Sequence, residues 1–255
     1  MLGLVKTEWD YTPLAAAYLK RPEYAEGPIQ EMLETARLLG GASVCDVGAG
    51  TGHLTVPLAK RGFHVTALEP NEAMRRYGIE RTISFPRVLW RAGTGEETGL
   101  PSSEFDLVIF GSSFNVTNRP LALKESARIL KGGGWFACLW NHRDLSDPLQ
   151  AAIEKIIHSH ISPYDYGARR EDQSGVIEAS GLFGEVRRIE DEISTTQTVA
   201  DCVEAWRSHA TLRRQAGDKF ELILTEISER LASTGKTQIQ IPYATRIWFA
   251  QSRGK

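Results

Sequence analysis

The chain has few cysteines and no excess of charge of either sign. Its 255 residues include three cysteines, 30 Lys and Arg, and 32 Asp and Glu, so the formal net charge is −2. Cys45, Cys138 and Cys202 are too few and too scattered for a disulfide framework or a zinc knuckle. No cluster of His, Asp and Glu residues predicts a metal site. Because a nucleic-acid binder neutralises many phosphates with basic residues, the near-neutral balance argues against a DNA partner.

Long apolar runs are also missing. No stretch approaches the roughly 18 apolar residues that span a bilayer, so we expect no membrane partner. The first residues, MLGLVKTEWDY, lack the basic start and apolar stretch of a signal peptide. We therefore expect a reducing, cytoplasmic location. With 42% hydrophobic and 24% charged residues, the composition is that of a globular protein large enough to bury a core without disulfides.

Strand and helix signals alternate between Gly41 and Asn141. Short apolar runs predict five strands, at 42–47, 63–68, 83–90, 105–110 and 135–140. Helical patterns separate them, at 53–61, 72–77 and 120–130. Short apolar strands that alternate with helices are typical of a parallel sheet covered on both faces. The predicted fold is therefore a doubly wound α/β domain.

The flanking segments add helices and two late strands. Helical patterns occupy 10–38, 146–160, 171–181, 198–210 and 217–232, and strand patterns occupy 184–194 and 243–251. The late strands would complete a seven-stranded, mostly parallel sheet. We predict a single domain over 1–255. Its core comprises 41–141, 171–195 and 237–255, and a helical lid comprises 1–40, 145–170 and 196–236.

A glycine-rich turn follows the first predicted strand, in the sequence Asp46-Val47-Gly48-Ala49-Gly50-Thr51-Gly52. Glycine lets the backbone approach a ligand closely, and ligands of doubly wound sheets bind at the carboxyl ends of the strands. The spacing G-x-G-x-G differs from the dinucleotide fingerprint G-x-G-x-x-G. An acid two residues before the first glycine suits a ligand with an ammonium group better than one with phosphates.

This segment resembles the first motif of the class I S-adenosylmethionine-dependent methyltransferases, whose glycine loop holds the amino-acid end of the cofactor. Glu69 ends the second predicted strand, where that family binds the ribose. Segments 93–101, 105–108 and 128–134 are similar to later motifs of the family. The rest of the chain is loosely similar to the small-molecule branch with type 11 methyltransferase domains, which includes trans-aconitate methyltransferases. The resemblance implies a Rossmann-like methyltransferase fold.

The resemblance also implies S-adenosyl-L-methionine as cofactor and S-adenosyl-L-homocysteine as product. The residues expected to bind it are Asp46, Gly48, Ala49, Gly50, Gly52, Glu69, Pro70, Thr94, Gly95, Glu96, Gly111, Ser112, Tyr18 and Arg21. His142 is the candidate general base, and Asn115 is a candidate for orienting the substrate. A guanidinium fork fits a carboxylate or phosphate, so Arg143, Arg207 and Arg246 are candidates for holding an anionic substrate.

The predicted activity is methyl transfer to an oxygen or nitrogen of a small-molecule substrate. Three alternatives remain open at this point: an RNA or protein methyltransferase, a binding protein that keeps the cofactor site without catalysis, and a nicotinamide enzyme. NAD enzymes also place an acid where Glu69 stands, so Glu69 alone does not separate these classes.

Overall fold

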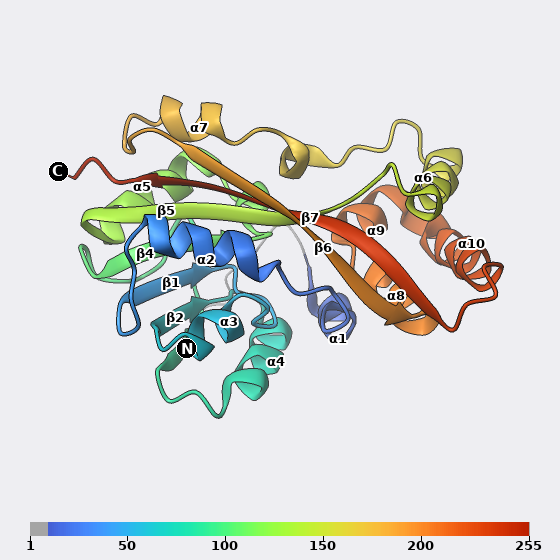
Figure 1. The fold of residues 1–255 in the computed structure, drawn as a ribbon, viewed down its shortest axis with the longest axis horizontal. Helices are drawn as coiled ribbons and strands as arrows, with labels where there is room; N and C mark the ends of the chain where they lie inside the picture. Colours follow the sequence, from blue (N-terminus) through green and yellow to red (C-terminus); the bar gives the residue numbers. More distant parts are fainter. Residues whose placement is uncertain (1–9, 255) are drawn as a thin grey trace.

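The computed structural model describes residues 10–254, and its centre is a seven-stranded sheet in the order β3-β2-β1-β4-β5-β7-β6 (Figure 1). The strands are β1 (Ser43–Val47), β2 (His64–Leu68), β3 (Val88–Arg91), β4 (Phe105–Gly111), β5 (Leu130–Arg143), β6 (Arg187–Thr198) and β7 (Gln238–Gln251). The first five run parallel, and β7 lies antiparallel between β5 and β6. The predicted fold class is therefore confirmed.

Helices connect the strands and extend beyond the sheet. They are η1 (Thr12–Leu14), α1 (Ala15–Tyr18), α2 (Glu26–Thr35), α3 (Thr55–Lys60), α4 (Glu72–Thr82), η2 (Phe114–Val116), α5 (Arg119–Ile129), α6 (Pro148–His160), η3 (Gly167–Arg170), α7 (Ser174–Ala179), α8 (Val199–Arg207), α9 (Ala210–Ala216), η4 (Gly217–Lys219) and α10 (Phe220–Ala232). Side-chain oxygens of Asn71, Asn118, Asp147 and Thr198 cap α4, α5, α6 and α8 by accepting backbone N–H bonds. Within residues 10–254, no helix is long and apolar enough to cross a membrane.

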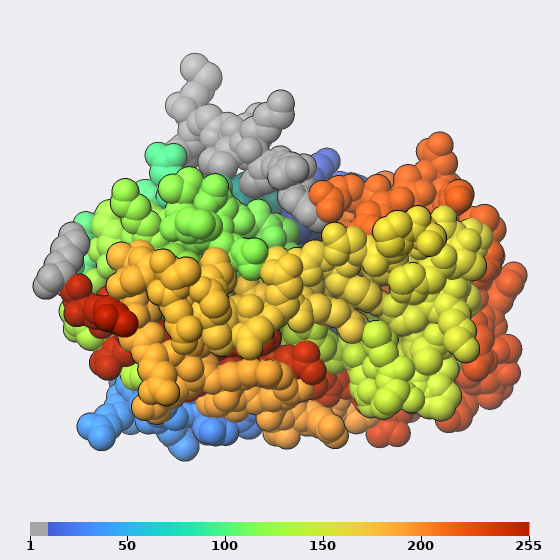
Figure 2. Space-filling model, turned by 90° about the horizontal axis from the view of Figure 1, so that it is seen from above, coloured from blue at the N-terminus to red at the C-terminus, as the bar shows by residue number. Residues whose placement is uncertain are grey.

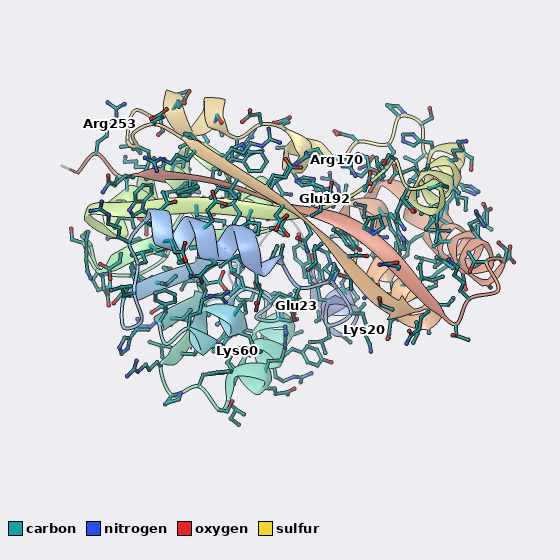
Figure 3. All side chains as sticks on the ribbon, in the orientation of Figure 1. Lys20, Glu23, Lys60, Arg170, Glu192 and Arg253 are labelled. Atoms are coloured by element: carbon teal, nitrogen blue, oxygen red, sulfur yellow. The ribbon has the colours of Figure 1, made fainter. Side chains whose placement is uncertain are left out.

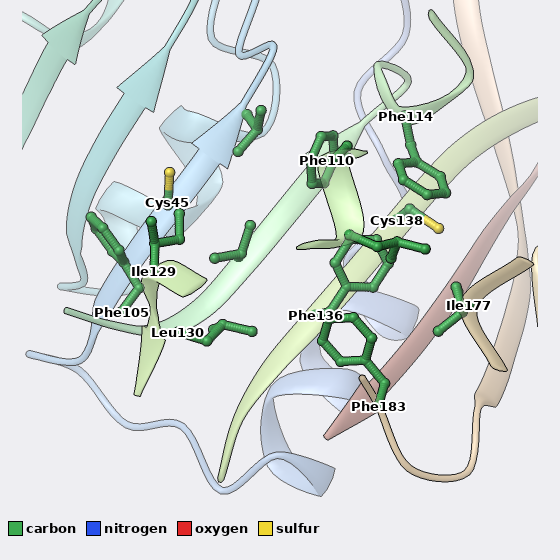
Figure 4. Packing of buried hydrophobic residues seen from close by; sticks show 14 of the residues in the cluster. Cys45, Phe105, Phe110, Phe114, Ile129, Leu130, Phe136, Cys138, Ile177 and Phe183 are labelled. Carbon is green, nitrogen blue, oxygen red and sulfur yellow. The ribbon is translucent and has the colours of Figure 1, made fainter. Parts of the chain in front are cut away.

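Both faces of the sheet are buried, as the alternation along β4 shows. Leu107 and Ile109 pack with residues of α2 and α3 on one face, while Val108 and Phe110 pack with α5 and α7 on the other. On that second face the rings of Phe110, Phe114 and Phe136 lie 5.3–5.6 Å apart (Figure 4). This packing fixes the carboxyl ends of the parallel strands, where the glycine loop emerges.

Besides the apolar residues on the two faces of the sheet, a third apolar cluster lies where β6 and β7 extend beyond the other strands (Figure 1). Ile239 and Ile241 of β7 pack there against α6, α8, α9 and α10, which we call the outer helices. The antiparallel pair of β6 and β7 is thus shared between the sheet and the outer helices. Whether these helices act as the predicted lid stays a prediction.

Several predicted element boundaries are wrong. The helix expected over 10–38 is broken between Leu19 and Ala25, where Pro22 interrupts it, and β3 begins at Val88, after Pro86. Strand β7 begins at Gln238 instead of 243, because Pro242 pairs with Ser194 of β6 at a position beyond the end of β5. Proline is tolerated where a strand has a neighbour on only one side. The signal-peptide expectation and part of the predicted lid concern residues 1–9, which lie outside the described residues.

Candidate active site

A cavity of about 960 Å³ lies at the carboxyl ends of the parallel strands and extends toward the outer helices. All but one of the residues predicted to bind the cofactor or to act in catalysis line it, namely Asp46, Gly48, Ala49, Gly50, Glu69, Pro70, Thr94, Gly95, Glu96, Gly111, Ser112, Tyr18, Arg21, Asn115 and His142. Gly52 is the exception, because it faces Trp90 and Gly78 of the neighbouring elements. The sequence therefore predicted which residues gather around one cavity, and their roles remain predictions.

The glycine loop is held between β1, β2 and β4. Gly48 has φ +67°, and a Cβ added there would lie 2.5 Å from the Cβ of Ser113, so this position requires glycine. The N–H of Ala49 donates to the carbonyl of Leu68 at 2.9 Å, and the N–H of Gly50 donates to Glu69 Oε2 at 2.8 Å. These bonds fix the loop before any ligand binds.

Asp46 is fully buried at the start of this loop. Its Oδ2 accepts a hydrogen bond from Thr55 Oγ1 at 2.7 Å, whereas its Oδ1 has no partner among the described residues. Burial, with a smaller contribution from Glu69, raises the pKa of Asp46 to about 7. A buried carboxylate oxygen without a partner is costly, so the position suits a ligand that brings a cationic or donor group.

Glu69 is also buried, with 6% of its surface exposed. Its Oε1 accepts from the N–H of Asn71 and its Oε2 from the N–H of Gly50, both at 2.8 Å. A carboxylate offers about four lone-pair sites, so each oxygen retains capacity for one further donor. Burial raises the pKa of Glu69 to about 6, because these two bonds compensate only part of the lost hydration. The arrangement fits a ligand that presents two neighbouring hydroxyl groups.

The neighbouring wall is formed by the loop after β3. Gly95 allows close packing, because an added Cβ would lie 3.0 Å from both Phe110 and Thr117. The carboxylate of Glu96 accepts from the N–H of Asn118 at 2.6 Å, and therefore organises the start of α5. This leaves backbone groups near Gly95 as the better candidates for contact with the adenine ring.

Residues 10–25, which we call the roof segment, cross over this part of the cavity. The rings of Tyr11 and Tyr18 meet edge to face with centroids 5.8 Å apart, and Tyr24 shares a 2.9 Å hydrogen bond with Ser112. Arg21 stacks on Tyr18 and donates to the side chain and carbonyl of Ser208, at 2.8 and 3.0 Å. The roof segment thus joins the sheet to α8.

His142 and Asn115 both line the cavity, but they differ in their hydrogen bonds. His142 Nε2 has no partner within the described part of the chain, while Asn115 Oδ1 accepts from Trp140 Nε1 at 2.9 Å. Burial and the nearby Arg246, Arg170 and Arg169 lower the pKa of His142 to about 3. His142 is therefore neutral near pH 7. It is also a weak base, since a general base works best when its pKa lies near the working pH and the pKa of His142 lies far below it.

Of the three arginines predicted to hold an anion, only Arg143 lines the cavity. Arg207 pairs with Glu204 and Glu221, and Arg246 pairs with Glu190, so these two form ion pairs within the chain, the usual alternative for such arginines. The cavity residues that the sequence did not reveal include Arg169, Arg170, Trp206, His209 and Tyr243. They come from the outer helices, β7 and η3. The sequence signals near them are the Pro/Tyr/Gly-rich segment 162–167, which precedes the two arginines, and Pro242-Tyr243, which is loosely similar to the small-molecule branch.

Comparisons with known proteins indicate the family of the chain. A family model described as a methyltransferase domain matches residues 45–138. An uncharacterised methyltransferase of Mycobacterium tuberculosis is 34% identical over 124 residues, covering 49% of this chain and 48% of that protein, so the chain spans about half the length of this curated relative. A demethylmenaquinone methyltransferase of Tropheryma whipplei is 30% identical over 177 residues, covering 65% of this chain and 72% of that protein.

Solved structures show the same fold. A candidate type II methyltransferase from Anaeromyxobacter dehalogenans superposes with a TM-score of 0.66 at 23% identity, covering 91% of this chain and 97% of that one. Phosphoethanolamine N-methyltransferase 2 of Haemonchus contortus, solved with S-adenosyl-L-methionine, gives 0.53 at 15% identity, covering 99% and 59%. The chain therefore belongs to the class I S-adenosylmethionine-dependent methyltransferases.

Proposed function

We propose that this chain transfers the methyl group of S-adenosyl-L-methionine to an oxygen or nitrogen of a small molecule. The observation that carries the proposal is the pair of buried acids, Asp46 and Glu69, whose carboxylates flank the glycine loop on one wall of the cavity. The unpartnered Asp46 Oδ1 suits the cofactor's ammonium group, and the remaining acceptor sites of Glu69 suit its two ribose hydroxyls.

When bound, the cofactor supplies an electrophilic methyl group attached to a sulfonium. The residues of the chain hold and enclose the reactants. The roof segment covers the cofactor end and excludes water, and alignment of the reacting atoms at about 3–3.5 Å can supply roughly 7–11 kcal/mol. A general base contributes only about 10²–10⁴-fold. The weakly basic His142 would accept a proton only from an acceptor that becomes strongly acidic as it reacts.

A cavity bounded by several elements supports a small substrate over an RNA or protein. The cavity is bounded by the sheet, the roof segment and the outer helices. The name of the Tropheryma relative refers to demethylmenaquinone, and that of the Haemonchus structure to phosphoethanolamine, both of which are small molecules. The three cysteines are free and buried, in keeping with the proposed cytoplasmic location.

The test combines binding with label transfer. S-adenosyl-L-homocysteine should bind in calorimetry, and deuterated methyl groups from the cofactor should appear in the small-molecule fraction of a cell extract. Glu69→Ala should weaken binding and reduce label transfer, whereas the exposed Glu72→Ala, three residues further along, should change neither. Failure to bind S-adenosyl-L-homocysteine would reject the proposed cofactor. Label found in RNA or protein would favour the macromolecular alternative, and binding without any transfer would favour the non-catalytic one.

A further inference from the structure

Three arginines line the end of the cavity that faces the outer helices. Arg143 ends β5 and is 9% exposed, and Arg169 and Arg170 are partly buried at the end of η3. Within residues 10–254, none of the three has a carboxylate within 4.0 Å. This end of the cavity therefore holds buried positive charge that the protein itself does not neutralise.

Two further acids line the cavity besides Asp46, Glu69 and Glu96, and they do not pair with these arginines. The carboxylate of Glu154 lies 3.8 Å from His158 Nε2, and that of Asp165 accepts from the N–H of Gly167 at 2.7 Å. Burial, Arg21 and the neighbouring Arg170 lower the pKa of Arg169. Since buried charges are normally paired, a ligand with negative charge would remove this repulsion.

Two of the guanidinium groups stack on aromatic rings. Arg143 lies over the ring of Trp206 with its Cζ 3.9 Å from the centroid, and Arg170 lies over Tyr166 at 4.0 Å. Arg143 uses one nitrogen to donate to Gln150 Oε1 at 3.0 Å. A stacked guanidinium keeps its edge available for further hydrogen bonds, and this edge matches the two oxygens of a carboxylate or phosphate.

Polar atoms without partners lie beside the same arginines. Trp206 Nε1, His209 Nδ1 and the hydroxyl of Tyr243 are buried and have no hydrogen-bond partner in the described part of the chain. Trp206 and His209 have ring centroids 4.8 Å apart and, with Tyr243, line the cavity. Buried polar groups in proteins are normally satisfied. A ligand that carries oxygen atoms on a flat apolar group would form hydrogen bonds with these atoms.

The arginines come from distant parts of the chain. Figure 3 shows Arg170 on the segment between α6 and α7, near the crossing of β6 and β7. Figure 2 shows that the chain from α6 to α7 covers this side of the molecule as a continuous band. Arg169 and Arg170 thus belong to a surface segment that also lines the cavity.

We propose that this end of the cavity binds an oxyanion, a carboxylate or phosphate, of an aromatic substrate. Arg143, Arg169 and Arg170 would hold the anion, and the rings of Trp206, Tyr166 and Tyr243 would contact the flat part. The proposal rests on the proposed function, because it names the class of substrate that occupies the same cavity as the cofactor.

The test uses three matched probes on the whole protein saturated with S-adenosyl-L-homocysteine. 2-Naphthoate, 2-naphthyl phosphate and uncharged 2-naphthamide share one ring system. Calorimetry should show at least one of the two anions binding about tenfold or more tightly than the amide, since a hydrogen bond to a charged group contributes about 1.5–3 kcal/mol. A preference for naphthoate or for naphthyl phosphate identifies which oxyanion the arginines hold.

Variants then locate the site. Arg169→Gln and Arg170→Gln should each weaken anion binding about tenfold or more and leave amide binding unchanged. Arg76→Gln, which removes the same charge from an exposed position on α4, should change neither. Equal affinities for anion and amide, no measurable binding of either anion, or unchanged anion binding in both folded variants would overturn the proposal.

The two proposals fail in different ways. If S-adenosyl-L-homocysteine does not bind, the proposed function fails at the first titration. If it binds and the naphthyl anions show no preference, only the oxyanion site fails. Because the comparison of anion with amide uses the unmodified protein, it decides the question even where a variant does not fold.

Discussion

Replacing Glu69 by alanine is the sharpest test of the cofactor site. The two carboxylate oxygens already accept backbone N–H bonds from Gly50 and Asn71, both at 2.8 Å, and each has room for one hydroxyl donor. Loss of two such bonds to a charged acceptor should weaken S-adenosyl-L-homocysteine binding by about 2–4 kcal/mol, after allowance for the desolvation of the carboxylate. This corresponds to a Kd raised about 30- to 900-fold.

The assay is calorimetric titration, accompanied by thermal unfolding of each variant. Glu69→Ala also leaves the N–H groups of Gly50 and Asn71 without acceptors, so some loss of stability is expected and must be measured separately. Glu69→Gln retains one acceptor oxygen and should lie between the native protein and the alanine variant. Glu72→Ala controls for the lost charge, because this side chain is exposed in the first turn of α4. An unchanged Kd in folded Glu69→Ala would remove Glu69 from the binding site.

Three further predictions concern the loop, the core and the titration of the site. Gly48→Ala should lower the melting temperature more than Gly99→Ala. Both positions have φ +67°, but only at Gly48 does an added Cβ lie 2.5 Å from a neighbouring atom. Equal losses would contradict the close-packing argument. In urea unfolding, Phe136→Ala should cost about 3–5 kcal/mol, whereas Leu121→Ala, which is 50% exposed, should cost far less, and a small loss at Phe136 would refute the packing. Binding of S-adenosyl-L-homocysteine should release protons near pH 7, since burial raises the pKa of Asp46 to about 7 and an ammonium group favours its ionised form. Calorimetry in buffers of different ionisation enthalpy measures this release, which Asp46→Asn should reduce. Because this pKa is raised in the folded state above its usual 3.8, the ligand-free protein should also lose stability as the pH rises from about 4 to 7.

The parallel part of the fold was predictable because its signals are local. Strands β1 to β4 are short, mostly apolar runs of four to seven residues, and β5 contains the apolar run 135–140 within a longer strand. The glycine loop follows the first of them. The errors fall where tertiary contacts override local patterns. Strand β7 continues through Pro242 because β6 supplies a partner on one side over its whole length. The alternation of polar and apolar residues over 238–241 is itself typical of a strand, and only Pro242 after it favours a break.

The cofactor end of the site was predictable for the same reason, and the other end was not. Asp46, Gly48 and Glu69 lie at the ends of neighbouring parallel strands, so their order in the sequence places them together. His209 and Trp206 instead reach the cavity because the outer helices fold back along β6 and β7. Their approach depends on packing between segments that are far apart in the chain.

The net charge of −2 does not show how the charged residues are distributed in the folded chain. A near-neutral total argues against a polyanionic partner, which needs basic residues spread over a large surface. It does not argue against a single anion. Arg21, Arg143, Arg169 and Arg170 come from three separate segments, so the sequence contains no basic run, yet all four act on one histidine. Together with burial, they lower the pKa of His209 well below its usual value. These arginines lie in separate segments of the sequence but line the same cavity, where the proposed oxyanion would offset their positive charge.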